Sequence, residues 1–159
     1  MHYFSNPPPL LFDFRRMSSD DGIVVLRLLE QVNRILDVCT PKSVSAQETA
    51  MLFGGLRHLH PSHVEVRHIL AHVLRLASLC NERLSDRGIM MVSMGVKVLI
   101  GKEEPSAKAV LNLARDLIEF SENSTSNQEF VSKMEKTRKR VIHLVSPSSS
   151  PTTEMNKVN

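Results

Sequence analysis

The sequence predicts an all-α fold, an antiparallel helix-pair solenoid with a period of about 40 residues and roughly six helices. Three observations predict it. Apolar residues recur at spacings of three and four, and strand-like alternation is absent. Polar breaks that contain Pro, Gly, Asn and Ser separate the apolar stretches, as is typical of helix ends. Short motifs then reappear 40 or 41 residues further along the chain.

Each helix is expected from its apolar stripe. The stripes run from Ile23 to Cys39, Met51 to Leu59, Val66 to Cys80, Ile89 to Leu99 and Val110 to Phe120, and a sixth helix starts near Asn127. Ser45 and Glu48 have the spacing of a capping box, as do Ser126 and Glu129. In such a box the serine accepts from the backbone three residues on while the glutamate reaches back, so each box predicts the start of a helix.

Two sets of matching positions indicate a repeat. At an offset of 41, Cys39 matches Cys80, and at an offset of 40, Gly55 matches Gly95. A glycine inside a helix costs about 1 kcal/mol relative to Ala, so its repetition predicts a close approach between the two helices of a pair. The chain is expected to contain half a repeat, two full repeats and half a repeat, with the last helix as a polar terminal cap.

Length and composition restrict the class of protein. The 159 residues are 42% hydrophobic and 23% charged, which is enough for one domain with a core and does not fit a disordered or collagen-like chain. No apolar run approaches the roughly 18 residues of a membrane-spanning helix, so no membrane partner is expected. Cys39 and Cys80 belong to no zinc or redox motif and are expected as reduced thiols.

The two ends of the chain differ from the middle. Residues 1–18 are predicted to be a disordered or targeting segment, residues 19–145 the α-helical repeat domain, and residues 146–159 a disordered Ser/Pro/Thr tail. Arg15 and Arg16 with the serines that follow favour mitochondrial import, whereas Asp20 and Asp21 do not. A mitochondrial and a cytoplasmic location therefore both stay open.

The segment from Ser45 to Leu59, written S-x-Q-E-x-x-x-L-x-x-G-L-x-x-L, resembles the short helical repeats of organelle RNA-associated proteins. These are the octotricopeptide and heptatricopeptide repeats and the related repeats of FAST-kinase-domain proteins. The resemblance extends over about residues 43–122, with Gly88 in place of the capping glutamate in the second unit. It implies an α-solenoid associated with RNA binding, transcript maturation or ribosome function. Armadillo and HEAT units have a similar length and act as protein scaffolds, so the architecture alone does not choose the partner.

Motifs for catalysis and for metal binding are incomplete. His68 and His72 have the i,i+4 spacing of two zinc ligands within a cluster of five histidines, but Ile69 stands where a zinc protease has glutamate. The segment from Gly95 to Glu103 has the wrong spacing for a phosphate loop. No catalytic residue, cofactor or metal is therefore predicted. The histidine cluster is the one feature that favours the alternative hypothesis of a metal-dependent hydrolase.

The patterns together predict a non-enzymatic helical-repeat adaptor or assembly subunit, and the resemblance implies a mitochondrial ribonucleoprotein as its setting. The alternative is a protein that binds RNA directly in organelle RNA processing. A protein partner or a multi-subunit assembly is expected, with RNA as the second candidate. The basic side chains of the last helix are expected to face outward. Candidate contacts with the partner or with RNA are Arg57, Arg67, Arg75, Lys97, Lys133, Lys136, Arg138, Lys139 and Arg140.

Overall fold

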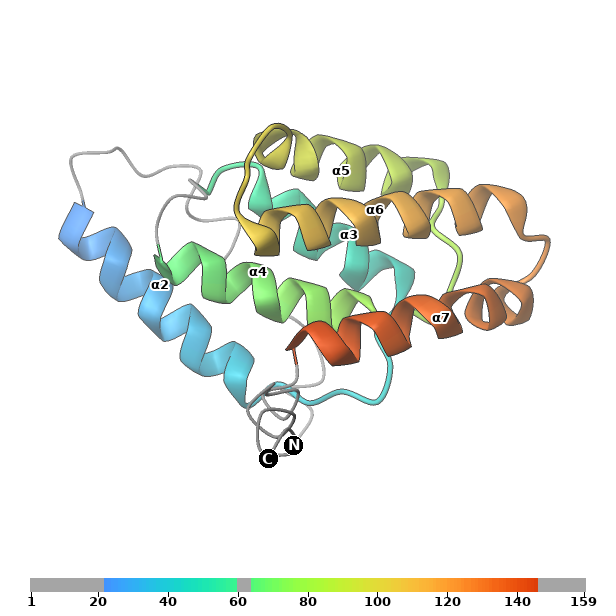
Figure 1. Ribbon diagram of the computed structural model, residues 1–159, viewed down its shortest axis with the longest axis horizontal. Helices are drawn as coiled ribbons and strands as arrows, with labels where there is room; N and C mark the ends of the chain where they lie inside the picture. Colours follow the sequence, from blue (N-terminus) through green and yellow to red (C-terminus); the bar gives the residue numbers. More distant parts are fainter. Residues whose placement is uncertain (1–21, 60–63, 146–159) are drawn as a thin grey trace, which may run out of the picture.

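The computed structural model describes residues 22–59 and 64–145, and these residues confirm the all-α prediction (Figure 1). The predicted end segments 1–18 and 146–159 lie outside the described residues. Residues 22–59 and 64–145 contain no β-strand, although Val44 and Cys80 form an isolated parallel bridge. No helix of this part of the chain is long and apolar enough to cross a membrane. The described residues form six α-helices, with a 3₁₀ turn at Lys97–Leu99. The helices are α2 (Gly22–Asp37), α3 (Ala46–Leu56), α4 (Val64–Ala77), α5 (Asp86–Val96), α6 (Pro105–Asn123) and α7 (Asn127–Val145).

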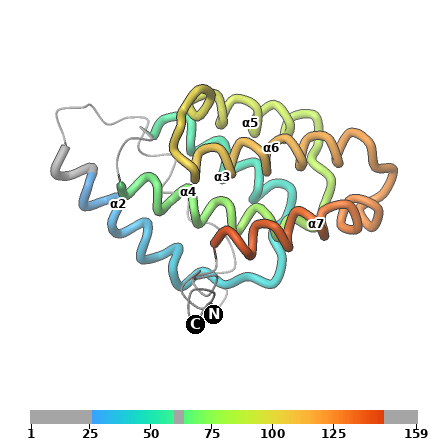
Figure 2. The backbone as a smooth tube through the Cα atoms, viewed as in Figure 1, coloured from blue at the N-terminus to red at the C-terminus, as the bar shows by residue number. Residues whose placement is uncertain are grey.

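The helices form two sets that run in opposite directions (Figures 1 and 2). Helices α2, α4 and α6 run one way, and α4 lies between the other two. Helices α3, α5 and α7 run the other way, and α3 packs most extensively on α5. The last helix, α7, packs on α6 and α4 and makes no comparable contact with α5 in the described chain. It therefore covers the row of α4 and α6 instead of extending the α3–α5 layer.

The predicted apolar stripes form one continuous core. Every member of the α4 stripe is buried, and the side chains of Phe53 from α3 and Phe130 from α7 are fully buried. The sequence places Ile142 on the apolar stripe of the last helix with Val141, but Ile142 is 60% exposed. Val141 is buried, and the rotation of about 100° between successive residues turns Ile142 away from the core.

Serine caps begin α3 and α5, 40 residues apart in the sequence. Ser45 Oγ accepts from the N–H of Glu48 at 3.1 Å, and Glu48 Oε1 accepts from the N–H of Ser45 at 3.0 Å. The first predicted capping box is thus confirmed. Ser85 Oγ accepts from the N–H of Gly88 at 3.1 Å, but glycine has no side chain to return the bond. Both caps satisfy N–H groups that the helix itself leaves unpaired.

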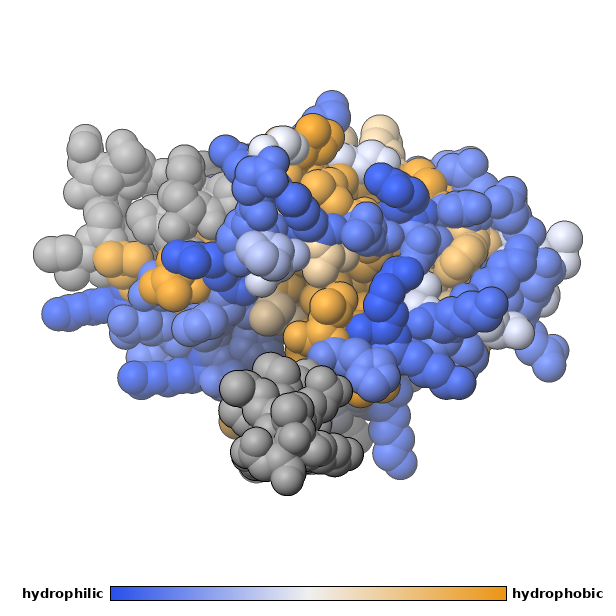
Figure 3. Space-filling view, viewed as in Figure 1, coloured by the Kyte–Doolittle hydropathy of each residue, from blue (hydrophilic) through white to orange (hydrophobic). Residues whose placement is uncertain are grey.

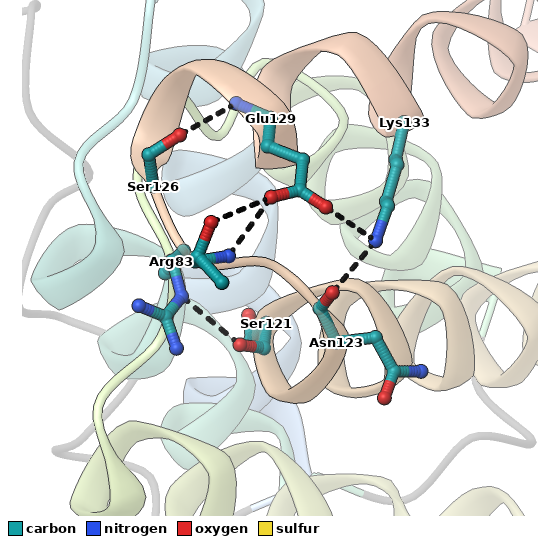
Figure 4. Close-up of polar contacts among 7 residues, drawn as sticks. Arg83, Ser121, Asn123, Ser126, Glu129 and Lys133 are labelled. Atoms are coloured by element: carbon teal, nitrogen blue, oxygen red, sulfur yellow. Dashed lines mark hydrogen bonds and ion pairs between the residues drawn. The ribbon is translucent and has the colours of Figure 1, made fainter.

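Glu129 joins the start of α7 to the turn before it (Figure 4). Ser126 Oγ accepts from the N–H of Glu129 at 3.2 Å, as predicted. The carboxylate, however, accepts from the N–H and the hydroxyl of Thr125 at 3.0 and 2.9 Å, so the second capping box is only half formed. Lys133 Nζ lies 3.2 Å from the same carboxylate. The bonds from Thr125, followed by the one from Lys133, lower the pKa of Glu129 to about 2.

We expect Glu129→Gln to remove an acid-sensitive contribution to stability. A carboxyl group with a lowered pKa stabilises the folded chain fully above its ordinary pKa of 4.5, and this contribution is lost as the pH falls towards about 2. The difference in urea midpoint between the wild type and Glu129→Gln should therefore be largest near neutral pH and shrink below about pH 4.5. Glu119→Gln, at an exposed site on α6, is the control. A difference that stays constant down to about pH 2.5 would contradict this role.

Candidate functional site, a methionine-lined groove

Helices α3 and α5 lie side by side, and their backbones touch at Gly95. A Cβ atom at this position would overlap the carbonyl group of Phe53 in α3 and lie 3.2 Å from its Cα. The predicted close approach at Gly95 is therefore present, but the pair of helices was predicted wrongly. The contact at Gly95 is between α5 and α3, and not between α5 and α6, the next helix in the chain. The glycine at position 95 carried no information about which backbone would come close to it.

A groove follows the outer side of this contact and is called the α3–α5 groove below. It consists of two adjoining hollows of about 640 and 240 Å³, which share Arg87 and Met91. The larger hollow begins at Ser45, the N-cap of α3, and the smaller one reaches Arg57, the C-cap. The groove therefore extends along the whole length of α3.

Methionine side chains form the walls of the groove. Of the eight methionines in the chain, four line it: Met51, Met90, Met91 and Met94. The side chain of Met90 is 56% exposed and that of Met94 is 39% exposed. Methionine is unbranched, flexible and polarisable, so it adapts to different apolar surfaces, and binding proteins use it for that purpose. The groove thus presents an adaptable apolar surface to the solvent.

The charged groups at one end of the groove are already engaged. Glu82 is the only carboxylate among the described residues of the lining, and its Oε1 accepts from the N–H of Ala46 at 3.1 Å. Arg83 donates from Nε to the backbone carbonyl of Ser121 at 3.1 Å, which directs its guanidinium towards the end of α6 (Figure 4). These groups hold the α4–α5 connection in place.

Two further arginines give the groove a positive edge. Arg57 is exposed and donates from Nε to Nε2 of His58 at 2.7 Å. Arg87 is exposed where the two hollows meet, and it makes no hydrogen bond or ion pair with any residue that the structure describes. An incoming anionic group would therefore meet the Arg87 guanidinium without displacing another partner.

Two of the predicted contact residues bind helix ends within the protein. Arg75 of α4 donates to the carbonyl oxygens of Leu36 and Cys39 at the end of α2, both at 2.8 Å. Arg138 of α7 donates to two carbonyls that follow α4, at 2.9 and 3.0 Å. A cation at a helix C-terminus binds carbonyl oxygens that have no partner within the helix, and it is attracted by the negative end of the helix dipole. Both guanidinium groups are therefore committed to the fold.

The remaining basic candidates divide into paired and unpaired side chains. Lys133 pairs with Glu129, and Arg140 Nη2 lies 2.6 Å from Asp116 Oδ2. The expectation that the α7 charges face outward is met by Lys136 and Lys139 and is wrong for Arg138. Figure 3 accordingly shows hydrophilic side chains over most of α7. Among the predicted contact residues, those that are exposed and make no hydrogen bond or ion pair with the described residues are Arg67, Lys97, Lys136 and Lys139.

The histidine cluster is only partly within the described residues, because 60–63 lie outside them. His72 Nε2 lies 2.9 Å from Asp37 Oδ1, and the Arg75 guanidinium, which can only donate, lies 3.2 Å from Nδ1. Burial, followed by the charge of Arg75, lowers the pKa of His72. His68 is exposed on the same helix. In the described chain no three His, Cys, Asp or Glu side chains gather in a way that could hold a metal ion.

The two cysteines are buried at the ends of α2 and α4 and form no disulfide. Cys80 donates from Sγ to the carbonyl oxygen of Glu82 at 3.2 Å. Burial raises the pKa of both thiols. Since the reactive species is the thiolate, burial disfavours the reactive form of both Cys39 and Cys80.

Sequence patterns did not reveal the groove. The signal was the spacing of Met90, Met91 and Met94, which places three methionines on one side of α5, together with Met51, 40 residues before Met91. Methionine is used both in cores and at binding surfaces, so the spacing alone does not decide between the two.

Comparison of the chain with protein-family models, with curated proteins and with solved structures finds no match.

Proposed function

We propose that the chain is a non-enzymatic helical-repeat adaptor that binds a protein partner in the α3–α5 groove. In this proposal α3–α4 and α5–α6 are the repeating helix pairs of a short solenoid, and α2 and α7 are its ends. The row of α2, α4 and α6 and the parallel packing of α3 on α5 support it, because each unit of a solenoid packs on its neighbours. The matching serine caps of α3 and α5 support it as well.

The observation that carries the proposal is the methionine wall of the groove. Apolar surface in water costs about 25 cal/mol per Å², so side chains such as Met90 and Met94 gain free energy when a partner covers them. The lining otherwise consists mainly of small residues, arginines and one carboxylate that is already bound to the start of α3. This composition suits docking of an apolar surface better than chemistry on a small substrate.

Direct RNA binding is the second candidate function, and the unpaired side chains of Lys136 and Lys139 favour it. Two observations weigh against it. The predicted contacts Arg75 and Arg138 are occupied by helix ends. Phe53, like the other fully buried phenylalanine, offers no platform on which bases could stack. A mitochondrial ribonucleoprotein remains the proposed setting, on the resemblance of the segment 45–59 alone.

We expect Met94→Glu to weaken capture of the protein partner at least about tenfold, because a carboxylate would have to be buried against the partner's apolar surface. Met94 is 39% exposed, so the variant should keep its fold. The measurement is a pull-down from native cells with and without ribonuclease, followed by quantitative mass spectrometry. The double variant Lys136→Gln, Lys139→Gln is the matched control and should capture normally. Partners that vanish with ribonuclease and with this control, but not with Met94→Glu, would establish RNA binding instead.

A further inference from the structure

We infer, building on the proposed function, that the occupant of the α3–α5 groove is an amphipathic α-helix of the partner whose apolar face is bordered by acidic residues. Three features of the groove lead to this inference: its length and walls, its floor, and its unpaired positive charge. Each of them restricts a different property of the occupant.

The length and walls of the groove fit a helix. Both α3 and α5 have 11 residues, which corresponds to about 16 Å or three turns, and a helix of equal length would lie along them. An extended strand would need an unpaired sheet edge, whereas α3 and α5 pair their backbone groups within each helix. A polyproline segment would need a groove lined by Tyr, Trp or Phe, and none of these lines either hollow in the described chain.

The floor of the groove allows a close approach. Ala46, Ala50 and Gly54 follow one another at intervals of four along one face of α3, and Gly88 faces them from α5. A Cβ at Gly88 would lie 3.7 Å from the Cβ of Ala50, so the two residues face each other. Neither has a side chain beyond Cβ that would project from the floor. A partner helix can settle on these small residues while the methionine side chains on either side cover its apolar face.

The charge of the groove selects acidic residues on the partner. Arg87 lies at the centre with no hydrogen bond or ion pair to the described residues, and Arg57 lies at one end. The described lining contains one carboxylate, that of Glu82, against the three guanidinium groups of Arg57, Arg83 and Arg87, so it is positive overall. Charges at the edge of an interface mainly determine which partner binds and how fast. Acidic side chains beside the apolar face are therefore expected on the occupant.

The test is a selection against the full chain from a displayed library of helices of about 14 residues. The i, i+3, i+4 and i+7 positions carry Leu, Ile, Met or Phe, and the flanking positions carry Glu, Lys or Gln. We expect glutamate to be enriched over lysine at the flanks. A central proline should abolish binding of the selected peptide, because it breaks the helix.

Reversing the charge of Arg87 tests whether the selected peptide binds in the α3–α5 groove. Arg87→Glu should weaken binding of the selected peptide at least tenfold, and replacing the flanking glutamates of the peptide by lysine should restore it. Arg67→Glu, which reverses an exposed arginine of α4 outside the groove, is the matched control and should leave binding unchanged. Enrichment of lysine or glutamine flanks, or equal binding by Arg87→Glu, would overturn the inference.

The outcomes also separate this inference from the proposed function. If the library yields no helix while capture of protein partners still depends on Met94, the adaptor function stands and the helical occupant is wrong. If neither the library nor the pull-down shows a ligand that depends on the groove, both are wrong.

Discussion

Replacing Gly95 by alanine is expected to lower the free energy of unfolding by about 3 kcal/mol and the melting temperature by about 10 °C. The added methyl group would overlap the carbonyl group of Phe53, which is part of the α3 backbone and cannot rotate away. The two helices would have to separate, and the core packing around the fully buried Phe53 would loosen. Alanine gains only about 1 kcal/mol in helix propensity over glycine, which does not offset this loss.

Gly88→Ala is the matched control, because it makes the same substitution at the same interface where space is available. The nearest atoms to its Cβ would be Ser85 Oγ at 3.4 Å and the Cβ of Leu84 at 3.6 Å, which are ordinary contacts. This variant should be as stable as the wild type or more stable by up to about 1 kcal/mol. Urea denaturation of both variants measures the difference. Equal stability of the two would show that α3 and α5 are not in backbone contact at Gly95.

Arg138→Ala is expected to destabilise the protein by about 2 kcal/mol. Arg138 Nε donates to the carbonyl oxygen of Ser78 at 2.9 Å, and its Nη2 donates to that of Cys80 at 3.0 Å. Charge-assisted bonds of this kind contribute about 1.5–3 kcal/mol, and the 21% exposure of this side chain places the effect towards the lower end. The substitution would also remove the donor from the carbonyls of Ser78 and Cys80, which follow α4, and weaken the contact between α4 and α7.

Lys139→Ala is the control for Arg138→Ala, because it removes the neighbouring positive charge from the same helix. Lys139 is exposed and has no hydrogen bond or ion pair within the described residues, so its loss should change stability by less than about 0.5 kcal/mol. Arg138→Lys should recover only part of the stability, since a single ammonium cannot reproduce the planar fork that reaches both carbonyls. If both alanine variants changed the free energy of unfolding equally, the effect would come from the loss of positive charge and not from the bonds of Arg138 to the carbonyls that follow α4.

The prediction at Gly95 also connects stability with the proposed binding surface. The same contact that brings α3 and α5 together defines the spacing of the groove walls, from Met51 on one helix to Met91 on the other. A variant that separates the helices without unfolding them is therefore expected to bind the selected peptide more weakly. Gly88→Ala, which adds one methyl to the floor, tests how closely the occupant approaches.

The helices and their starts were predictable because they depend on residues close together in the chain. The i+3 and i+4 periodicity of the α4 stripe led to a helix whose stripe is fully buried. The spacing of Ser45 and Glu48 led to a complete capping box at α3. The same reasoning was only half right at Ser126, where Thr125 competes successfully for the carboxylate of Glu129. Local patterns identify the interacting groups, and small differences in turn geometry decide which of them bond.

The roles of individual basic residues were not predictable, because their partners are distant in sequence. Arg138 and Lys139 are neighbours in one basic run, yet one binds a carbonyl 60 residues away and the other faces the solvent. Arg75 likewise reaches carbonyls 36 and 39 residues back. Each assignment depends on the angle at which one helix crosses another, and no local pattern contains that angle.

By itself the sequence determined the six helices of the described residues, their apolar faces and the serine caps of α3 and α7. Only the tertiary structure decided that Gly95 meets α3, that α7 lies on α4 and α6, and that methionines 40 residues apart line one groove. The physical reason is that helix formation and capping involve hydrogen bonds over three or four residues. Which helix faces then meet is settled by burial of apolar surface over the whole chain, a non-directional force that leaves no short-range signature.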